Sequence, residues 1–193
     1  MAGHARYTAL LDACVLYPLA MTDALMSLAT AGFFAAKWTT KIEDEWIRSL
    51  EKQRPDLAGK LWTRRDGMRD AIPDWEVPES AWSSITGGIV LPDPGDVHVL
   101  AAAIAGHADC IVTANLKDFP NSVLMHYGIE AIDPDTFIIN QWDLDPVNAI
   151  AAFKRMRARR KKPQSSPEDF AYALEIGGLP TTAERLRLAA ELI

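Results

Sequence analysis

The chain has 193 residues, of which 49% are hydrophobic and 24% are charged. These proportions are typical of a globular protein and exclude the disordered, collagen-like and coiled-coil classes. The best membrane-span candidate, residues 24–36, is too short, and residues 1–6 lack the apolar run of a signal peptide. Two cysteines, Cys14 and Cys110, are too few for a disulfide scaffold, and each is interpreted as a small buried hydrophobic residue. We therefore expect a cytoplasmic protein with no membrane contact.

Charge is distributed unevenly along the chain. Residues 1–144 contain 11 Lys and Arg against 20 Asp and Glu, a net charge of −9, whereas residues 145–193 contain 9 against 6, a net charge of +3. The total of −6 at first argues against a nucleic-acid partner, because such proteins usually carry a basic surface. The asymmetry instead predicts an acidic body, residues 1–144, and a basic helical C-terminal extension, residues 145–193.

Short apolar runs alternate with stretches of helical spacing along the first two thirds of the chain. Thr39 and Thr40 are both N-cap candidates for the second predicted helix, and Thr40 with Glu43 resembles a capping box. Strands that alternate with helices predict an α/β fold with a mostly parallel sheet. Predicted strands are residues 7–12, 33–38, 89–91, 111–113 and 130–132, and predicted helices are residues 18–31, 41–52, 55–71, 79–85 and 97–107, with only helices beyond residue 134.

Oxygen-bearing side chains follow three of the predicted strands. Asp12 ends the first strand, Asp93 and Asp96 follow the third, and Asn115 and Asp118 follow the fourth. Because ligands bind outside the carboxyl ends of parallel strands, we expect these side chains to converge on one crevice. Clustered carboxylates repel one another unless a cation neutralises them, and Mg²⁺ and Mn²⁺ prefer oxygen ligands and bridge phosphates. The set predicts metal-assisted phosphodiester hydrolysis, although each Asp taken alone is more often a turn or helix cap.

Three segments of the chain carry a resemblance to a known family: LLDACVLYP, the predicted helix with IEDEWIRSL, and LPDPGDVHVLAAAIAGHADCIVTANLKDFP. In order and spacing they are similar to PIN-domain ribonucleases, and most similar to the VapC-like toxins of bacterial type II toxin–antitoxin pairs. The likeness covers residues 6–140, and residues 91–120 are its most specific part. It implies a three-layer α/β/α fold with a central mostly parallel sheet and a C-terminal helical appendage. It also implies an Mg²⁺- or Mn²⁺-dependent endoribonuclease with an RNA substrate, a cognate antitoxin and a homodimeric state.

The resemblance also implies roles for individual residues. Asp12, Glu45 and Asp96 match the first three family acids, which are catalytic and bind the metal. Glu45 is preferred to Glu43 because it directly precedes the aromatic and apolar residues of its helix, as in the family. Thr113 matches a hydroxyl residue that commonly lies near the metal. Without the resemblance, Glu45 would be interpreted as a solvated helical acid and Thr113 as an ordinary strand residue.

The chain departs from the family pattern at the fourth acid. The family often has Thr-Gly-Asp there, whereas residues 113–115 are Thr-Ala-Asn. The amide of Asn115 can ligate Mg²⁺ but brings no charge, and Asp118 is the candidate for the missing carboxylate, with Asp93 as an auxiliary ligand. We therefore expect one tightly held metal, or two with a weak second site. The departure keeps open a non-catalytic PIN-like module that binds RNA or protein, and an RNA-processing nuclease that is not a toxin is a further alternative.

Two basic clusters are candidates for RNA contact. Arg64, Arg65 and Arg69 lie on one predicted helix, and the run at residues 154–162 has seven positive residues in nine. The same run fits a solvated helix or a docking surface for an acidic antitoxin segment equally well. From this run we take three candidate RNA contacts: Arg155, Arg159 and Lys162.

The remaining notable residues receive structural interpretations. His98 and His107 lie nine positions apart on one predicted helix, too far to share a ligand, and are expected to be structural or surface residues. Asp109 is expected to cap a turn outside the site. A phosphoryl-transfer enzyme with Asp12 as nucleophile would need a lysine at a strand end, and Lys117 is the only candidate. Six tryptophans are assigned to the core or a partner surface, with base stacking left open for each: Trp38, Trp46, Trp62, Trp75, Trp82 and Trp142.

Overall fold

The computed structural model describes residues 7–160 and 165–193 of the chain. Four short strands form one sheet in the order β2-β1-β3-β4, and every neighbouring pair is parallel. The buried central strands β1 and β3 are apolar along their whole length or nearly so, as expected of a sheet covered on both faces. The strands are β1 (Thr8–Leu11), β2 (Ala35–Lys37), β3 (Cys110–Val112) and β4 (Glu130–Ile132).

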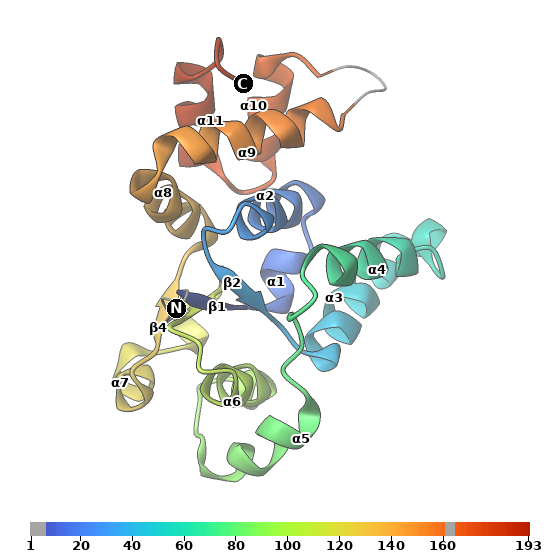
Figure 1. The fold of residues 1–193 in the computed structure, drawn as a ribbon. Coiled ribbons are helices and arrows are strands. Elements are labelled where there is room, and N and C mark those ends of the chain that lie inside the picture. Colours follow the sequence, from blue (N-terminus) through green and yellow to red (C-terminus); the bar gives the residue numbers. More distant parts are fainter. Residues whose placement is uncertain (1–6, 161–164) are drawn as a thin grey trace.

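Helices cover both faces of this sheet. Figure 1 shows α2 (Leu19–Thr30) on one side of the sheet and α6 (Val97–Ala105) on the other. Residues 98–103 of α6 are all buried, because a helix enclosed between the sheet and a further layer has little solvent-facing surface. The predicted three-layer α/β/α fold with a parallel sheet is confirmed. The other elements before residue 130 are helices α1 (Ala13–Leu16), α3 (Thr40–Gln53), α4 (Trp62–Ala71), α5 (Glu79–Trp82) and α7 (Asn121–Leu124), and 3₁₀ turns η1 (Pro55–Leu57), η2 (Ser83–Gly88), η3 (Pro94–Asp96), η4 (Leu116–Asp118) and η5 (Met125–Tyr127).

The C-terminal part is helical, as predicted, and packs on the sheet-distal side of α2 (Figure 1). A buried carboxylate joins its first and last helices. Asp135 of α8 accepts hydrogen bonds from the backbone N–H of Thr181 at 2.6 Å, the N–H of Thr182 at 2.9 Å and the Thr182 hydroxyl at 2.7 Å. It thereby caps the N-terminus of α11, which has no cap from its own preceding side chain. These helices are α8 (Pro134–Leu144), α9 (Pro146–Ala158), α10 (Pro167–Ile176) and α11 (Pro180–Leu188).

Two local predictions are wrong. Residues 89–91 are not a strand: Val90 is 82% exposed and the segment pairs with no strand among the described residues. A three-residue apolar run carries too little periodicity to separate a strand from an extended segment with two buried anchors. The cap of α3 is Thr39, whose hydroxyl accepts from the Ile42 N–H at 3.1 Å, and Thr40 is already helical. Because no strand precedes Asp93 and Asp96, the turn η3 and helix α6 position these acids instead.

Two further features differ from or limit the sequence predictions. The predicted helix at residues 55–71 is divided into η1 and α4, with Gly59 between them in a left-handed conformation at φ 71°. Of the basic run at residues 154–162, Lys161 and Lys162 lie outside the described residues. Among the helices that the structure describes, none is long and apolar enough to cross a bilayer.

Candidate active site

Asp12 lies where β1 ends and α1 begins, and its side chain is almost completely buried. One carboxylate oxygen, Oδ1, accepts the N–H of Ala13 at 2.6 Å. The other, Oδ2, accepts the hydroxyl of Thr113 at 2.8 Å and the thiol of Cys14 at 2.9 Å. A carboxylate with three donors is held in one orientation, because turning it would leave a buried charge without these bonds. Asp12 is therefore preorganised at the carboxyl edge of the sheet.

Thr113 reaches Asp12 because β1 and β3 are neighbours in the sheet. Leu11 is in register with Val112, and the N–H of Asp12 donates to the Val112 carbonyl at 3.2 Å. The fully buried Thr113 hydroxyl accepts from the N–H of Asn115 at 3.0 Å and donates to Asp12. Since a hydroxyl has one proton, this pairing fixes which way the proton points. Thr113 thus links the end of β3 to the candidate metal ligand on β1.

Asp96 lies close to three other acids at the start of α6. Burial, together with the negative charges of Asp12, Asp93 and Asp118, raises the pKa of Asp96 to about 6, and His98 opposes part of this shift. Coulombic shifts of this kind require neighbours within several ångströms. The acids that the sequence assigned to separate strand ends are therefore brought together, although η3 rather than a strand carries two of them.

Glu45 of α3 contacts His98 of α6, which lies two residues after Asp96. Its Oε1 lies 2.9 Å from Nε2 of the buried His98, a contact that is an ion pair when the imidazole is protonated. Glu43, two residues earlier, is almost completely buried and bonded elsewhere: it accepts the indole N–H of Trp38 at 2.9 Å and pairs with Arg69. The two glutamates thus have different surroundings: among the described residues Glu45 contacts α6 through His98, whereas Glu43 is bonded to Trp38 and Arg69.

Asn115 and Asp118 occupy the turn that follows β3. Asn115 is exposed, and its carbonyl accepts the N–H of Asp118 at 2.9 Å, so the chain folds back on itself within η4. This turn brings the half-buried Asp118 close enough to act on the pKa of Asp96. The side chain of Asn115 makes no hydrogen bond within residues 7–160 and 165–193. An uncharged amide stands at the position where the family often has a carboxylate.

The donor set suits a hard divalent cation. Asp12, Glu45, Asp96 and Asp118 supply carboxylate oxygens and Asn115 an amide oxygen, which is the ligand chemistry of Mg²⁺ and Mn²⁺. Burial and repulsion from neighbouring carboxylates raise the pKa of Asp96, and a bound cation would offset this repulsion. Within the described ranges, no three His, Cys, Asp or Glu side chains are already close enough to form a metal cage. Because Asp12 is held by its three donors, ligation would require the other carboxylates to turn towards it.

The arginines of α4 are bonded within the fold. Arg64 donates to the carbonyls of Leu16 and Tyr17 and to the Thr22 hydroxyl, and its guanidinium lies 4.6 Å from the ring centroid of Trp46. Burial lowers the pKa of Arg64 to about 10. This side chain ties α4 to the turn between α1 and α2.

The other candidate RNA contacts differ in whether their side chains already have ion-pair partners. Arg69 pairs with the buried Glu43, and Arg65 pairs with its neighbour Asp66. Arg159 pairs with Asp23 of α2 at 2.5 Å. Arg155, which is exposed on α9, has no ion-pair or hydrogen-bonding side-chain partner among the residues that the structure describes, and Lys162 lies outside them.

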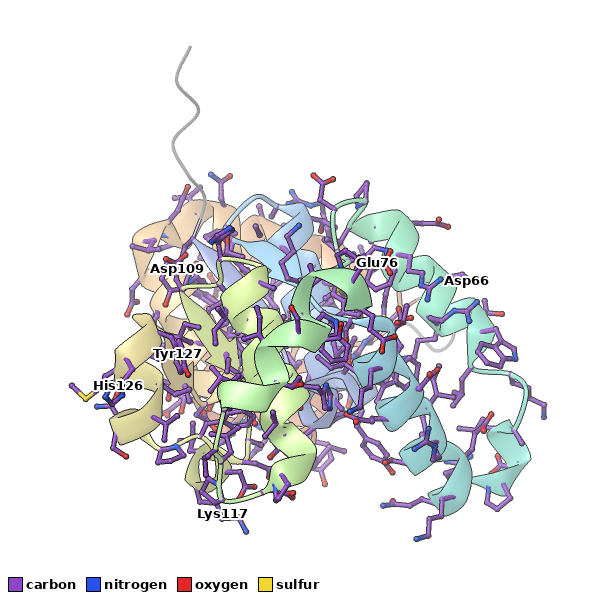
Figure 2. All side chains as sticks on the ribbon, turned by 90° about the horizontal axis from the view of Figure 1, so that it is seen from below. Asp66, Glu76, Asp109, Lys117, His126 and Tyr127 are labelled. Atoms are coloured by element: carbon purple, nitrogen blue, oxygen red, sulfur yellow. The ribbon has the colours of Figure 1, made fainter. Side chains whose placement is uncertain are left out.

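Among the described residues, Lys117 makes no ion pair or hydrogen bond with Asp12, whose carboxylate is bonded to Ala13, Cys14 and Thr113. Figure 2 shows Lys117 at the outer edge of the molecule, at the opposite end from Asp109 in that view. Asp109 precedes β3 and accepts the N–H of Thr8 at 2.7 Å, so it joins the amino ends of β1 and β3. The structural role predicted for Asp109 agrees with this bond.

Sequence reasoning missed two residues that contact the candidate ligands. Cys14, interpreted as a small buried hydrophobic residue, is half-buried and donates its thiol proton to Asp12. Burial and the charge of Asp12 raise the pKa of the Cys14 thiol to about 12, which keeps it a donor at neutral pH. His98 contacts Glu45. Each lies two positions after a candidate acid, Asp12 or Asp96, and that spacing was the available indication.

Comparisons with known proteins agree with this architecture. Residues 8–117 match a family model described as PIN domain, and residues 134–188 match one described as VapC50 C-terminal domain. A segment of 49 residues is 53% identical to "Putative ribonuclease VapC50" of Mycobacterium tuberculosis (strain ATCC 25618 / H37Rv) and spans 25% of this chain and 29% of that protein. No solved structure matches the chain. Because the PIN-domain model covers more than half of its residues, the chain belongs to the PIN-domain family, with a VapC50-like C-terminal part.

Proposed function

We propose that this protein is an Mg²⁺- or Mn²⁺-dependent endoribonuclease that hydrolyses RNA phosphodiester bonds. The observation that carries the proposal is the approach of Asp12, Asp93 and Asp118 to Asp96 at the carboxyl edge of the sheet, where burial and these three charges raise the pKa of Asp96. Grouped carboxylates are unfavourable in a folded protein unless a cation offsets them. Membership of the PIN-domain family makes a nuclease the natural use of such a group.

Each residue has a defined role in this proposal. Asp12, Glu45 and Asp96 hold the cation, with Asn115 and Asp118 as further ligands and Asp93 as an auxiliary. When bound, the divalent cation supplies Lewis acidity, which activates water and offsets charge on the phosphate oxygens. Thr113 holds Asp12 in its ligating orientation through the 2.8 Å hydrogen bond. His98 holds Glu45 against α6.

The proposal extends to a biological role and partners. We infer that the nuclease is the toxin of a type II toxin–antitoxin pair, blocked by a cognate antitoxin, and that it forms a homodimer. Support comes from the C-terminal match to the VapC50 domain model and from the segment that is 53% identical to VapC50. Since that segment spans 29% of VapC50, the activity and partners of the whole relative are carried over only as proposals.

We assign RNA contact to basic residues that are exposed or that pair only with an adjacent surface acid. The guanidinium groups of Arg64 and Arg69 are bonded to carbonyls and to Glu43, so we assign them a structural role first. Arg65 and the exposed Arg155 are the preferred RNA contacts of the two clusters. A contact with a phosphate contributes a salt-dependent term to affinity, which is measurable for each residue separately.

RNA cleavage with added Mn²⁺ tests the proposed function. The wild-type chain is expected to cut single-stranded RNA, and Asp12→Asn and Asp96→Asn are each expected to lower the rate by about 100-fold or more, because each removes a charged ligand. Asp44→Asn, an exposed acid next to Glu45, is the matched control and should retain activity. RNA that stays intact with the wild type, or equal rates in all four chains, would overturn the enzyme assignment. Binding without cleavage would favour the non-catalytic module.

A further inference from the structure

A second concave site lies beside the candidate metal centre. Its volume is about 390 Å³, within the range of small-ligand sites, which are about 300–1,000 Å³. It lies between the start of α3, helix α5 with the following turn η2, and the start of α6. Its principal lining residues are Lys41, Trp82, Ser83, Thr86, Val97 and His98.

The cavity and the metal centre share a wall. His98 lines the cavity and also lies 2.9 Å from Glu45, and its charge acts on the pKa of Asp96. Lys41 lies four residues before Glu45 on α3, so the two side chains are neighbours on one side of that helix. A polymer whose phosphate lies at the acids therefore has its adjacent unit within reach of this cavity.

The charge at the mouth of the cavity suits a phosphate. Lys41 is exposed, and within residues 7–160 and 165–193 its ammonium has no ion-pair or hydrogen-bond partner. The arginines of α4, by contrast, are bonded within the fold or to a neighbouring acid. Glu79 is the acid among the lining residues, and it is exposed at the start of α5. The unpaired ammonium of Lys41, one helical turn from Glu45, is the available counter-charge for a backbone phosphate.

The inner wall of the cavity suits a flat heterocycle. The rings of Trp82 and His98 are both more than nine-tenths buried, with centroids 6.0 Å apart. The indole Nε1 of Trp82 and Nδ1 of His98 have no hydrogen-bond partner among the described residues, which is unusual for buried nitrogens. Ser83 and Thr86 add hydroxyl groups to the lining, and the Thr86 hydroxyl donates to the Ser83 carbonyl at 2.8 Å and keeps its acceptor capacity. Aromatic faces combined with polar edges and a cation are the surroundings in which single-stranded nucleotides bind.

We propose that this cavity binds the nucleotide of single-stranded RNA next to the scissile phosphate, with Lys41 against the backbone phosphate and the Trp82–His98 wall against the base. The inference rests on the proposed nuclease function, because it takes RNA as the ligand of the neighbouring acids. Trp82 is thereby singled out among the six tryptophans as the base-facing one.

Lys41 is tested against a lysine of the same helix. Lys41→Gln and Lys52→Gln make the same charge change on α3, about 16 Å apart along the helix axis. Fluorescence anisotropy of the full chain with a labelled single-stranded RNA 12-mer, in EDTA so that no RNA is cut, gives the dissociation constants. Lys41→Gln is expected to raise Kd by about 3- to 10-fold and to lower the salt slope by about 0.7, because one phosphate contact is lost. Lys52→Gln should match the wild type.

Filling the cavity tests the base contact. Ser83→Phe places a large ring in the space from an exposed position, and Ser84→Phe makes the same change at the exposed neighbour, which does not line the cavity. Ser83→Phe is expected to raise both Kd and KM at least threefold, and to relax base preference at one position of the cleaved sequence. Ser84→Phe should bind RNA like the wild type. Thermal unfolding of each variant verifies that it is folded.

The outcomes separate the two proposals. Wild-type affinity in both Lys41→Gln and Ser83→Phe overturns the nucleotide site, whether or not the protein cuts RNA. Affinity that depends on Lys41 and Ser83, in a chain that cuts no RNA with Mn²⁺, supports the nucleotide site and overturns the nuclease function. Equal losses in Lys41→Gln and Lys52→Gln also overturn the site, because they indicate nonspecific attraction to α3.

Discussion

At the scale of single residues, the candidate active site is organised around one buried carboxylate. Asp12 has a donor for each oxygen, and the donors come from its own helix start and from the neighbouring strand β3. Of these donors, Thr113 comes from the greatest distance in sequence, 101 residues away. The orientation of the Asp12 carboxylate therefore depends on correct pairing of β1 with β3.

Removal of that hydroxyl tests the role of Thr113. Thr113→Val keeps the shape of the side chain but leaves Oδ2 of Asp12 without its donor from β3. Loss of a group that hydrogen-bonds to a metal ligand typically costs about 10- to 100-fold in metal affinity or activity, and we expect a loss in this range for Mn²⁺ affinity and RNA cleavage. Calorimetric Mn²⁺ titration and cleavage rates measure it. Thr113→Ser retains the hydroxyl and should restore most of the loss, and a fully active Thr113→Val would contradict the role.

The raised pKa of Asp96 predicts how stability depends on pH without metal. Its folded-state pKa of about 6 lies above the ordinary value for Asp, so between about pH 4 and pH 6 the folded state binds more protons than the unfolded state. Asp96 therefore lowers the free energy of unfolding as pH rises through this window. After discount for solvent screening, we expect a change on the order of 1 kcal/mol.

Urea unfolding in EDTA at pH 4.5 and pH 7 measures this effect. Asp96→Asn cannot titrate and should lose that part of the pH dependence, whereas Asp44→Asn should behave like the wild type. Protons also compete with a cation for Asp96, so the apparent Mn²⁺ affinity should weaken as pH falls through about 6. An Asp96→Asn chain with the wild-type pH profile would show that the acids do not interact as described.

At the scale of secondary-structure elements, one arginine connects α4 to the helices that follow β1. Arg64 satisfies the carbonyls of Leu16 and Tyr17, which end the short helix α1. Helix ends leave carbonyl groups without partners, and a cation at this end is favourable. Arg64 thereby supplies hydrogen-bond donors to carbonyls that a longer α1 would have satisfied. Pro18 prevents that continuation of the helix.

The neighbouring arginines of α4 allow a matched test of this connection. Arg64→Met should lower the free energy of unfolding by about 1–3 kcal/mol, because buried carbonyls lose a charged donor. Arg65→Met, which breaks only a pair with the adjacent Asp66, should change it by less than about 1 kcal/mol. Urea midpoints of the two chains give the comparison. Equal stability of the two variants would show that the Arg64 bonds contribute little.

At the scale of the whole molecule, the candidate metal ligands come from segments far apart in sequence, and the C-terminal helices lie on the other side of α2 from the sheet (Figure 1). Because the ligands converge only in the folded chain, a cation that binds there stabilises the fold by mass action. At a concentration of 100 Kd this amounts to about 2.7 kcal/mol, or roughly 5–10 °C in Tm for a domain of this size.

Thermal unfolding with increasing Mn²⁺ tests this coupling. Tm of the wild type should rise with Mn²⁺, and Asp12→Asn and Asp96→Asn should abolish most of the rise. Calorimetry should detect one tight Mn²⁺ site, with any second site weak, because Asn115 brings no charge where the family often has an acid. Two equally tight sites in the wild-type chain would contradict this expectation, and a Tm that ignores Mn²⁺ would contradict the site itself.

The sequence by itself determined the α/β class, the parallel sheet and the helical C-terminal part. Alternating apolar runs and helical periodicity are local properties, and the block at residues 91–120 carries the family pattern. It also provided the candidate acids Asp12, Glu45 and Asp96, each marked by its place after a strand or on a helix. It failed at residues 89–91, where three apolar residues are too few to reveal whether a partner strand exists.

The tertiary structure alone decided which side chains meet. Cys14 and Thr113 bond to Asp12, His98 contacts Glu45, and the carboxylate of Asp135 caps a helix 46 residues away. No local pattern encodes these contacts, because each depends on the parallel pairing of β1 with β3 or on the packing of one helix against another. The mutual approach of the acids has the same origin. Residue type therefore specified the available chemistry, and strand order and helix packing decided which groups act together.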